Sequence, residues 1–280
     1  MRRLGDRRDG TLIRDIDAMH YVMPLMYPNR CDNEAYITME VELAGVEQYI
    51  KEQNAGRSDE DRLSLFGIMI AASLKTIHDR PHMNRFIANQ NIYQRNHISA
   101  AFTVKKEFSD EGDETLARIV ACDDDNLDSI QRQVNEQIRF CKTQDDESTE
   151  AMNFIKKLPF KHFIGRVARW ADRHGWMPKS VIATDPYQCS VVLTNLGSIG
   201  MNIGYHHLMN WGTNSVFIEI GEKVYRPVLD NKGNSRVKKV IKLSFTIDER
   251  ISDGYYYAKS LRLLKRLVEN PELLQEKFGN

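Results

Sequence analysis

The fold of this chain is decided by the stretch Phe245-Thr246-Ile247-Asp248-Glu249-Arg250-Ile251-Ser252-Asp253-Gly254. This stretch ends an apolar run, 240–247, that is typical of a buried strand. It also precedes an amphipathic segment, 256–270, in which Leu261, Leu264 and Val268 recur at helical spacing. The pattern therefore predicts a long strand, a short charged turn and a long helix at the C-terminal end of the chain.

The composition is that of a globular protein with an ordinary core. The chain has 280 residues, of which 41% are hydrophobic and 28% charged, enough for one large domain or two small ones. Lysine plus arginine and aspartate plus glutamate both number 39, so the formal net charge is zero. The absence of a basic excess argues against a nucleic-acid partner, and no acidic tail indicates disorder.

The cysteines and the apolar runs indicate a protein of the reducing cytoplasm. The four cysteines are far apart and form no Cys-x-x-Cys pair, so we expect neither a metal site nor a disulfide framework. No apolar run approaches the ~20 residues that span a bilayer. The charged start of the chain has no apolar stretch behind it and is not interpreted as a signal peptide. We therefore expect no membrane association.

The rest of the chain alternates between strand-like and helix-like patterns. Strands are predicted at 35–43, 86–93, 97–105, 115–120, 189–195, 215–220, 223–228 and 236–247. Helices are predicted at 46–53, 63–78, 127–142, 149–174 and 256–270, and a hairpin turn at 230–234. The irregular order of these elements, without internal repeats in the sequence, favours one integrated α/β domain.

The opening stretch resembles the active-site signature of the chloramphenicol acetyltransferase superfamily. That superfamily includes the catalytic domains of the 2-oxoacid dehydrogenase acyltransferases, the dihydrolipoamide acyltransferases. Their signature reads Asp-His-Arg-x-x-Asp-Gly, and this chain matches it at Asp248, Arg250, Asp253 and Gly254. The position of the catalytic histidine is occupied by Glu249.

The resemblance extends over most of the chain, from about residue 30 to about residue 278, and it is strongest after residue 180. The tail 267–274 is similar to the end of the family's catalytic domain. The segment 192–200 resembles the family's Ile-Ser-Asn-Leu-Gly run, with Thr194 at the position of the serine. Residues 1–29 are expected to be an extension that packs on the core. Residues 30–280 are expected to be an acyltransferase-type domain, without a lipoyl or subunit-binding domain.

The resemblance implies both a fold and an assembly. The expected fold is an α/β (α+β) two-layer sandwich of the chloramphenicol acetyltransferase type, with a mixed sheet and packed helices. In the family the working unit is a homotrimer, and the active site lies in a channel between subunits. The implied ligand is coenzyme A or an acyl-CoA, and the implied partners are further copies of this chain and a separate lipoyl carrier protein.

The resemblance also implies roles for three residues. In the family a histidine takes the proton from a thiol or hydroxyl acceptor, which attacks an acyl thioester, and a hydroxyl group stabilises the oxyanion. Glu249 would therefore be the base, Thr194 the oxyanion donor and Asp253 the organiser of the turn. The family role of Asp253 is an ion pair, for which Arg250 and Arg30 are candidate partners.

A glutamate at the base position leaves three functions open. A glutamate carboxylate, whose pKa in water is ~4.3, is a weak base towards a thiol of ~8.5, and its charge repels a developing oxyanion. Loss of the general base alone would cost ~10²–10⁴-fold in rate. The chain is therefore a weakly active acyltransferase, a non-catalytic trimeric scaffold or CoA-binding pseudoenzyme, or a thioester hydrolase in which Glu249 activates water.

Three histidines are further candidates near the site. His206 and His207 are adjacent, so their side chains point to different sides of an extended chain and do not form a metal pair by themselves. One of them is a candidate for a displaced base in the channel, and the alternative is a satisfied loop histidine. His97, at the start of a predicted strand, is a candidate for lining the thioester channel, against an alternative of simple burial or exposure.

Overall fold

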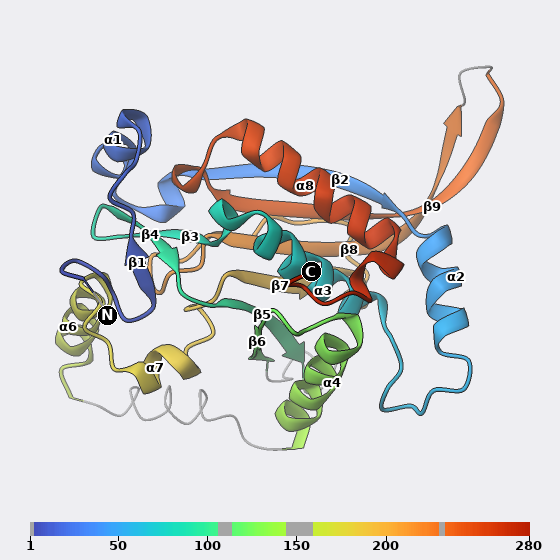
Figure 1. Ribbon diagram of the computed structural model, residues 1–280, viewed down its shortest axis with the longest axis horizontal. Coiled ribbons are helices and arrows are strands. Elements are labelled where there is room, and N and C mark those ends of the chain that lie inside the picture. Colours follow the sequence, from blue (N-terminus) through green and yellow to red (C-terminus); the bar gives the residue numbers. More distant parts are fainter. Residues whose placement is uncertain (1–2, 106–113, 144–158, 230–232) are drawn as a thin grey trace.

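The protein is built around one mixed six-stranded sheet (Figure 1). The computed structural model describes residues 3–105, 114–143, 159–229 and 233–280. The strands lie in the order β2-β9-β8-β7-β5-β6. Their bounds are β2 (Glu34–Glu42), β5 (Ile98–Lys105), β6 (Glu114–Ala121), β7 (Val191–Asn195), β8 (Val216–Leu229) and β9 (Ser235–Asp248). Strand β7 runs parallel to β5 and β8, and the other neighbours are antiparallel.

A layer of helices covers one face of this sheet (Figure 1). Helices α3 (Leu65–Asp79) and α8 (Gly254–Glu269) lie across the sheet, and α4 (Leu127–Thr143) packs against α3 and β6. Alternate strand residues such as Leu243, Phe245 and Ile218 point into this layer and belong to one buried cluster with both helices. The predicted two-layer arrangement is therefore confirmed.

The predicted strand 86–93 is wrong, because the chain turns back in its middle. The structure has β3 (Arg85–Ala88) and β4 (Asn91–Arg95), which pair as an antiparallel hairpin, and β1 (Gly10–Leu12) adds to the free edge of β4. The two residues between the strands, Asn89 and Gln90, have φ angles of 45° and 60°. Left-handed backbone at two successive residues is the geometry of a tight hairpin turn.

Strand β8 is also longer than predicted. The predicted strands 215–220 and 223–228 form one strand with a register shift between Ile220 and Lys223. Gly221 lies in this bulge, and a Cβ atom built on it would stand 1.6 Å from the carbonyl oxygen of Asn202. Only glycine permits so close an approach of two backbone segments. The bulge therefore holds the segment after β7 against β8.

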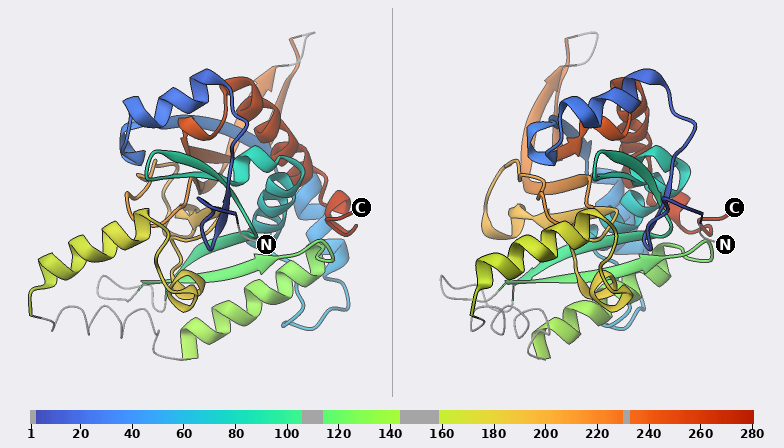
Figure 2. Two further views of the ribbon diagram at one scale, coloured as in Figure 1. Left: turned by 60° about the vertical axis from the view of Figure 1, so that its left-hand side comes forward. Right: turned by 90° about the vertical axis from the view of Figure 1, so that its left-hand side faces the viewer.

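The remaining helices lie around the edges of the two layers (Figures 1 and 2). They are α1 (Ala18–Met26), α2 (Ala44–Gln53), α6 (Lys161–Arg173) and α7 (Lys179–Thr184). The sequence patterns did not predict α1 and α7. The predicted helix 149–174 is described only from residue 159, where it contains α6, and residues 230–232 of the predicted hairpin turn lie outside the described residues. Within the described ranges, each helix is too short or too polar to cross a membrane.

Candidate active site

The signature forms a tight turn between β9 and α8. Strand β9 ends at Asp248, a short 3-10 helix spans Glu249–Ile251, and α8 begins at Gly254. The backbone of Glu249 is fixed on both sides, because its N–H donates to the carbonyl of Asn33 at 2.8 Å and its carbonyl accepts from the Tyr257 hydroxyl at 3.1 Å. Burial raises the pKa of Tyr257, which therefore stays a donor. The side chain of Glu249 is exposed at the surface of the chain.

Asp248 anchors the turn through a buried ion pair. Its carboxylate is fully buried and accepts from the guanidinium of Arg250 at 2.8 and 2.7 Å. A second guanidinium, that of Arg30, lies 3.7 Å away, and burial lowers the pKa of Arg30 to about 10, so it remains charged at neutral pH. This bidentate contact fixes the residue that directly precedes Glu249.

The interpretation that Arg250 or Arg30 pairs with Asp253 is wrong. Both arginines face Asp248 instead. Asp253 is exposed, and its carboxylate accepts from the backbone N–H of Tyr256 at 2.8 Å as the N-cap of α8. A carboxylate at this position satisfies one of the free N–H groups of the first helical turn. Asp253 therefore helps to start the helix, and the ion pair belongs to the aspartate five residues earlier.

Thr194 lies near the end of β7, on the sheet face that points away from α3 and α8. In register with it across the sheet are Glu219 of β8, Ser244 of β9 and Thr38 of β2. Residues in register on neighbouring strands share a face. Thr194 is half-buried, and its neighbour Glu219 is a buried carboxylic acid whose pKa is raised by burial. The sequence analysis missed Glu219, although a charged residue inside the apolar run 216–220 was a signal for it.

One chain alone does not bring Thr194 and Glu249 together. The residue of β9 that lies in register with Thr194 is Ser244, four residues before Asp248. At 3.3 Å per residue along a strand and about 4.8 Å between strands, the Cα atoms of Thr194 and Asp248 are roughly 16 Å apart. Neither side chain bridges that gap to a common carbonyl group. A site that uses both residues therefore needs a second copy of the chain.

The segment 200–212 covers the same face of the sheet. The hydroxyl of Ser244 donates to the carbonyl of Gly204 at 2.5 Å, and the Thr38 hydroxyl contacts the hydroxyl of Tyr205. The two adjacent histidines of this segment do point to different sides, as predicted. The His206 ring stacks on Phe217 with centroids 4.5 Å apart, whereas the His207 ring lies against a carboxylate of β2.

His97 lies apart from the signature. It precedes β5, which is separated from β9 by β7 and β8, and it lines a cavity of about 390 Å³ with Arg118. The Arg118 guanidinium lies 2.8 Å from Nε2 of His97 and donates to that nitrogen when the imidazole is neutral. Burial, together with Arg95 and Arg118, lowers the pKa of His97 to about 4. His97 is therefore a neutral acceptor in this cavity at neutral pH.

Replacing His97 with glutamine is expected to make the stability less sensitive to acid. Because the folded-state pKa of about 4 lies below the ~6.5 of an unfolded histidine, the unfolded chain binds more protons between these values. The contribution of His97 to stability is thus complete above pH ~6.5 and is lost as the pH falls towards 4.

Urea titrations of both proteins at about pH 7 and about pH 4.5 measure this difference. Burial also lowers the pKa of His82 to about 4, so His82 contributes the same acid sensitivity to both proteins. Between these two pH values, we expect the free energy of unfolding to fall less in His97→Gln than in the wild type. Equal decreases would contradict the lowered pKa of His97.

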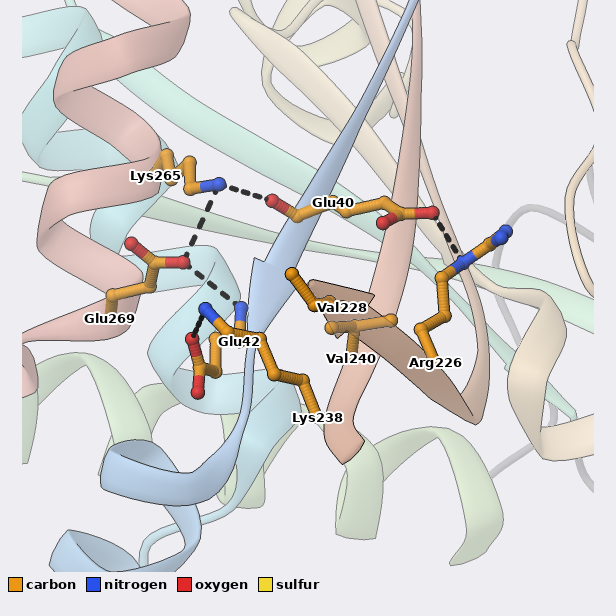
Figure 3. Close-up of a pocket in the computed structure, with 8 residues that line it drawn as sticks. All are labelled: Glu40, Glu42, Arg226, Val228, Lys238, Val240, Lys265 and Glu269. Carbon is orange, nitrogen blue, oxygen red and sulfur yellow. Dashed lines mark hydrogen bonds and ion pairs between the residues drawn. The ribbon is translucent and has the colours of Figure 1, made fainter. Parts of the chain in front are cut away.

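A second cavity, of about 310 Å³, lies where the β8–β9 hairpin leaves β2 (Figure 3). Its charged side chains neutralise one another within the cavity. The ion pairs are Arg226 with Glu40 at 2.7 Å, Lys265 with Glu269 at 3.6 Å, and Lys238 with Glu42. Three cations face three carboxylates, and Val228 and Val240 complete the lining. This cavity therefore offers no uncompensated charge for a ligand or for catalysis.

Comparison with known proteins bears out the resemblance. Residues 181–275 match the family model of the catalytic domain of the 2-oxoacid dehydrogenases acyltransferase, a range that contains both β7 and the signature turn. None of the curated proteins matches the sequence.

Solved acyltransferase cores have the same fold. The dihydrolipoamide acetyltransferase of Azotobacter vinelandii, studied for the role of a serine, a histidine and an asparagine in its catalytic mechanism, superposes with a TM-score of 0.61 at 16% identity, over 94% of each chain. The cubic core of a pyruvate dehydrogenase multienzyme complex gives 0.60 at 16% identity, again over 94% of each chain. A chloramphenicol acetyltransferase gives 0.52 at 16% identity, over 95% of this chain and 99% of that one. The chain therefore has the chloramphenicol acetyltransferase-type fold.

Proposed function

We propose that this protein is an acyltransferase of the 2-oxoacid dehydrogenase catalytic-domain type. It transfers an acyl group from a coenzyme A thioester to a thiol or hydroxyl acceptor. The observation that carries the proposal is the family-model match over 181–275, which covers the two segments that bear the site, the end of β7 and the signature turn. A separate lipoyl carrier protein is the natural source of a thiol acceptor, and the cytoplasm is the expected compartment.

The proposed working unit is a homotrimer with shared active sites. The separation of Thr194 and Glu249 within one chain supports this arrangement, because the two residues meet only if neighbouring copies each supply one of them. The similarity in fold to a core from a multienzyme complex also supports an assembly. In each site, Thr194 of one protomer faces the signature turn of the next.

The chemistry divides between these two segments. The acceptor loses its proton to a base and attacks the thioester carbon, and the carbonyl oxygen becomes an oxyanion. The Thr194 hydroxyl donates a hydrogen bond to this oxyanion, and collapse of the intermediate expels the coenzyme A thiolate, which takes up a proton. The end of β7 is paired with β8 up to Asn195, one residue beyond Thr194, so the hydroxyl is positioned before the reaction begins.

Thr194→Val is the direct test of this function. Valine keeps the shape of the side chain but removes the donor, so kcat is expected to fall by ~10²–10³-fold. Thr194→Ser keeps the hydroxyl and is expected to retain most of the activity. Acetyl-CoA is supplied with dihydrolipoamide, and the acetylated product is quantified by mass spectrometry. Equal rates for the wild type and Thr194→Val would remove Thr194 from the site.

A trimeric pseudoenzyme that binds coenzyme A without turnover is the second candidate. The observation that favours it is the exposed carboxylate of Glu249 at the position of the family's base. Calorimetric binding of coenzyme A to a wild type without turnover, together with turnover in Glu249→His, would establish this function. Release of free acetate without an acetylated acceptor would instead identify hydrolysis, with Glu249 activating water.

A further inference from the structure

We infer that His207, oriented by the buried carboxylate of Glu34, is the proton acceptor of this site. It takes the role of the family's histidine, for which Glu249 is a weak substitute. The inference rests on the proposed acyl transfer and names the residue that begins it. Neither residue belongs to the signature, and the two are 173 positions apart in the sequence.

The two side chains form an imidazole–carboxylate dyad. Nδ1 of His207 lies 3.0 Å from a carboxylate oxygen of Glu34. The Glu34 side chain is 1% exposed, whereas the His207 side chain is 79% exposed. A carboxylate only accepts hydrogen bonds, so Nδ1 carries the proton of the neutral ring. Nε2 then has a free lone pair, and it belongs to the exposed end of the dyad.

Glu34 is held firmly enough to orient the ring. One carboxylate oxygen accepts from the backbone N–H of Leu208 at 2.5 Å, and the other accepts from the Tyr36 hydroxyl at 2.5 Å. The hydrogen bond to Glu34, with burial, raises the pKa of Tyr36 to about 12, so this hydroxyl remains a donor. The carboxylate thus has fixed donors from both β2 and the covering segment, and His207 completes the set.

The dyad adjoins the signature turn. Glu34 pairs in register with Asp248, the residue directly before Glu249. The backbone N–H of Glu249 donates to the carbonyl of Asn33, the residue directly before Glu34. The imidazole therefore lies on the same end of the sheet as the position where the family places its histidine. Both the His207 ring and the Glu249 side chain are exposed there.

Two ionisable groups on this side of the sheet, Asp248 and Tyr205, have other partners. Asp248 faces Arg250 and Arg30. The Tyr205 ring packs edge-on against Tyr36, with centroids 5.3 Å apart.

The neighbouring histidine lies near the buried carboxylate of Glu219, but within the described residues its ring makes no hydrogen bond to a carboxylate. The His206 ring stacks on Phe217, and its Nδ1 lies 2.8 Å from the carbonyl of His207. Of the two adjacent imidazoles, His207 is the one whose ring is hydrogen-bonded to a buried carboxylate, the arrangement that orients a general base.

The proton then follows a closed path. Nε2 of His207 takes the proton of the acceptor S–H or O–H as the acceptor atom bonds to the thioester carbon. The resulting imidazolium is stabilised by the Glu34 carboxylate. When the tetrahedral intermediate collapses, the bond from carbon to the coenzyme A sulfur breaks, and the imidazolium returns its proton to that sulfur. An acyl-CoA and a thiol become an acyl thioester and coenzyme A, without any other reactant.

The first test compares His207→Gln with His206→Gln, a matched control at the adjacent position. Turnover of acetyl-CoA with dihydrolipoamide is expected to fall by ~10²–10⁴-fold in His207→Gln, the range for loss of a general base. His206→Gln is expected to stay close to the wild type. A wild type that is active and a His207→Gln variant of equal activity would overturn this inference while leaving the proposed acyl transfer intact. A wild type without turnover would overturn the proposed function and the inference together.

Glu34→Gln separates positioning from a merely structural role. Glutamine keeps one acceptor oxygen, which serves the backbone N–H of Leu208, but its amide nitrogen only donates and it lacks the charge that favours the imidazolium. We expect a smaller loss than in His207→Gln, and we expect the loss to fall on kcat while KM stays close to the wild-type value. An unchanged kcat would overturn the role of Glu34 as the orienting group.

Mixed assemblies test whether the dyad and Thr194 serve one shared site. Thr194→Val and His207→Gln subunits are unfolded together and refolded as a mixture. If each site takes His207 from one protomer and Thr194 from its neighbour, some mixed sites combine His207 of a Thr194→Val subunit with Thr194 of a His207→Gln subunit. Activity well above that of either parent is then expected. A mixture no more active than its parents would overturn the placement of His207 opposite Thr194.

Discussion

Replacing Asp248 with alanine is expected to lower the free energy of unfolding by about 3–5 kcal/mol, the range for removing one partner of a buried ion pair. The variant leaves the guanidinium of Arg250, which is 1% exposed, without the carboxylate that it contacts through two nitrogens. It also removes the nearest carboxylate from the buried Arg30. Two buried cations without their counter-charge make this the most destabilising single change in the signature.

Asp253→Ala is the matched control for this variant. It removes a carboxylate from the same turn, but an exposed one that caps α8. Loss of an N-cap costs about 1 kcal/mol. Urea unfolding followed by circular dichroism measures both variants. If Asp253→Ala were the more destabilised of the two, the motif ion pair would have been assigned to the wrong aspartate.

Replacing Phe163 and Trp170 with aspartate is expected to convert the proposed trimer into monomers and to abolish turnover. These side chains are 63% and 49% exposed, and Val167 between them is 47% exposed. Their spacing of four and three residues places them on one side of α6, a helix on the outside of the molecule (Figure 2). Exposed apolar patches are often sites of protein–protein contact, and we assign this one to a second copy of the chain in the proposed trimer.

Light scattering coupled to gel filtration measures the assembly state of these variants. Arg169→Ser, an exposed change away from the stripe, is the control and is expected to leave the mass unchanged. Activity should be lost together with the assembly, because in the proposed trimer Thr194 and the signature turn meet between protomers. Charged substitutions that leave both the mass and the rate unchanged would show that α6 lies outside the interface.

Local patterns predicted most of the framework. The apolar run 240–247 and the helical spacing after it correspond to β9 and α8, and the buried helix expected at 63–78 is α3. Such patterns are local, because the side chains of a strand alternate and those of a helix recur every three to four residues. The hairpin at 85–95 escaped prediction because its turn residues, Asn89 and Gln90, give a weaker signal than Asn-Gly.

The site was predicted less completely than the framework. Glu249, Thr194 and Asp253 were found through the resemblance of short motifs, and the motifs give their positions in the chain. They do not give their contacts. Asp253 is a helix cap rather than an ion-pair partner, because Arg30 and Arg250 both contact Asp248 at the end of β9.

The sequence by itself determined most of the long strands and helices of this protein, the resemblance of its signature and the presence of Glu249 where the family has a histidine. Only the tertiary structure decided which charges meet. The register of β2 with β9 places Glu34 beside Asp248, and the covering segment brings His207 to that carboxylate from 173 residues away. The physical reason is that periodicity is a property of neighbouring residues, whereas the contacts of a buried carboxylate depend on strand order and register, which no local pattern specifies.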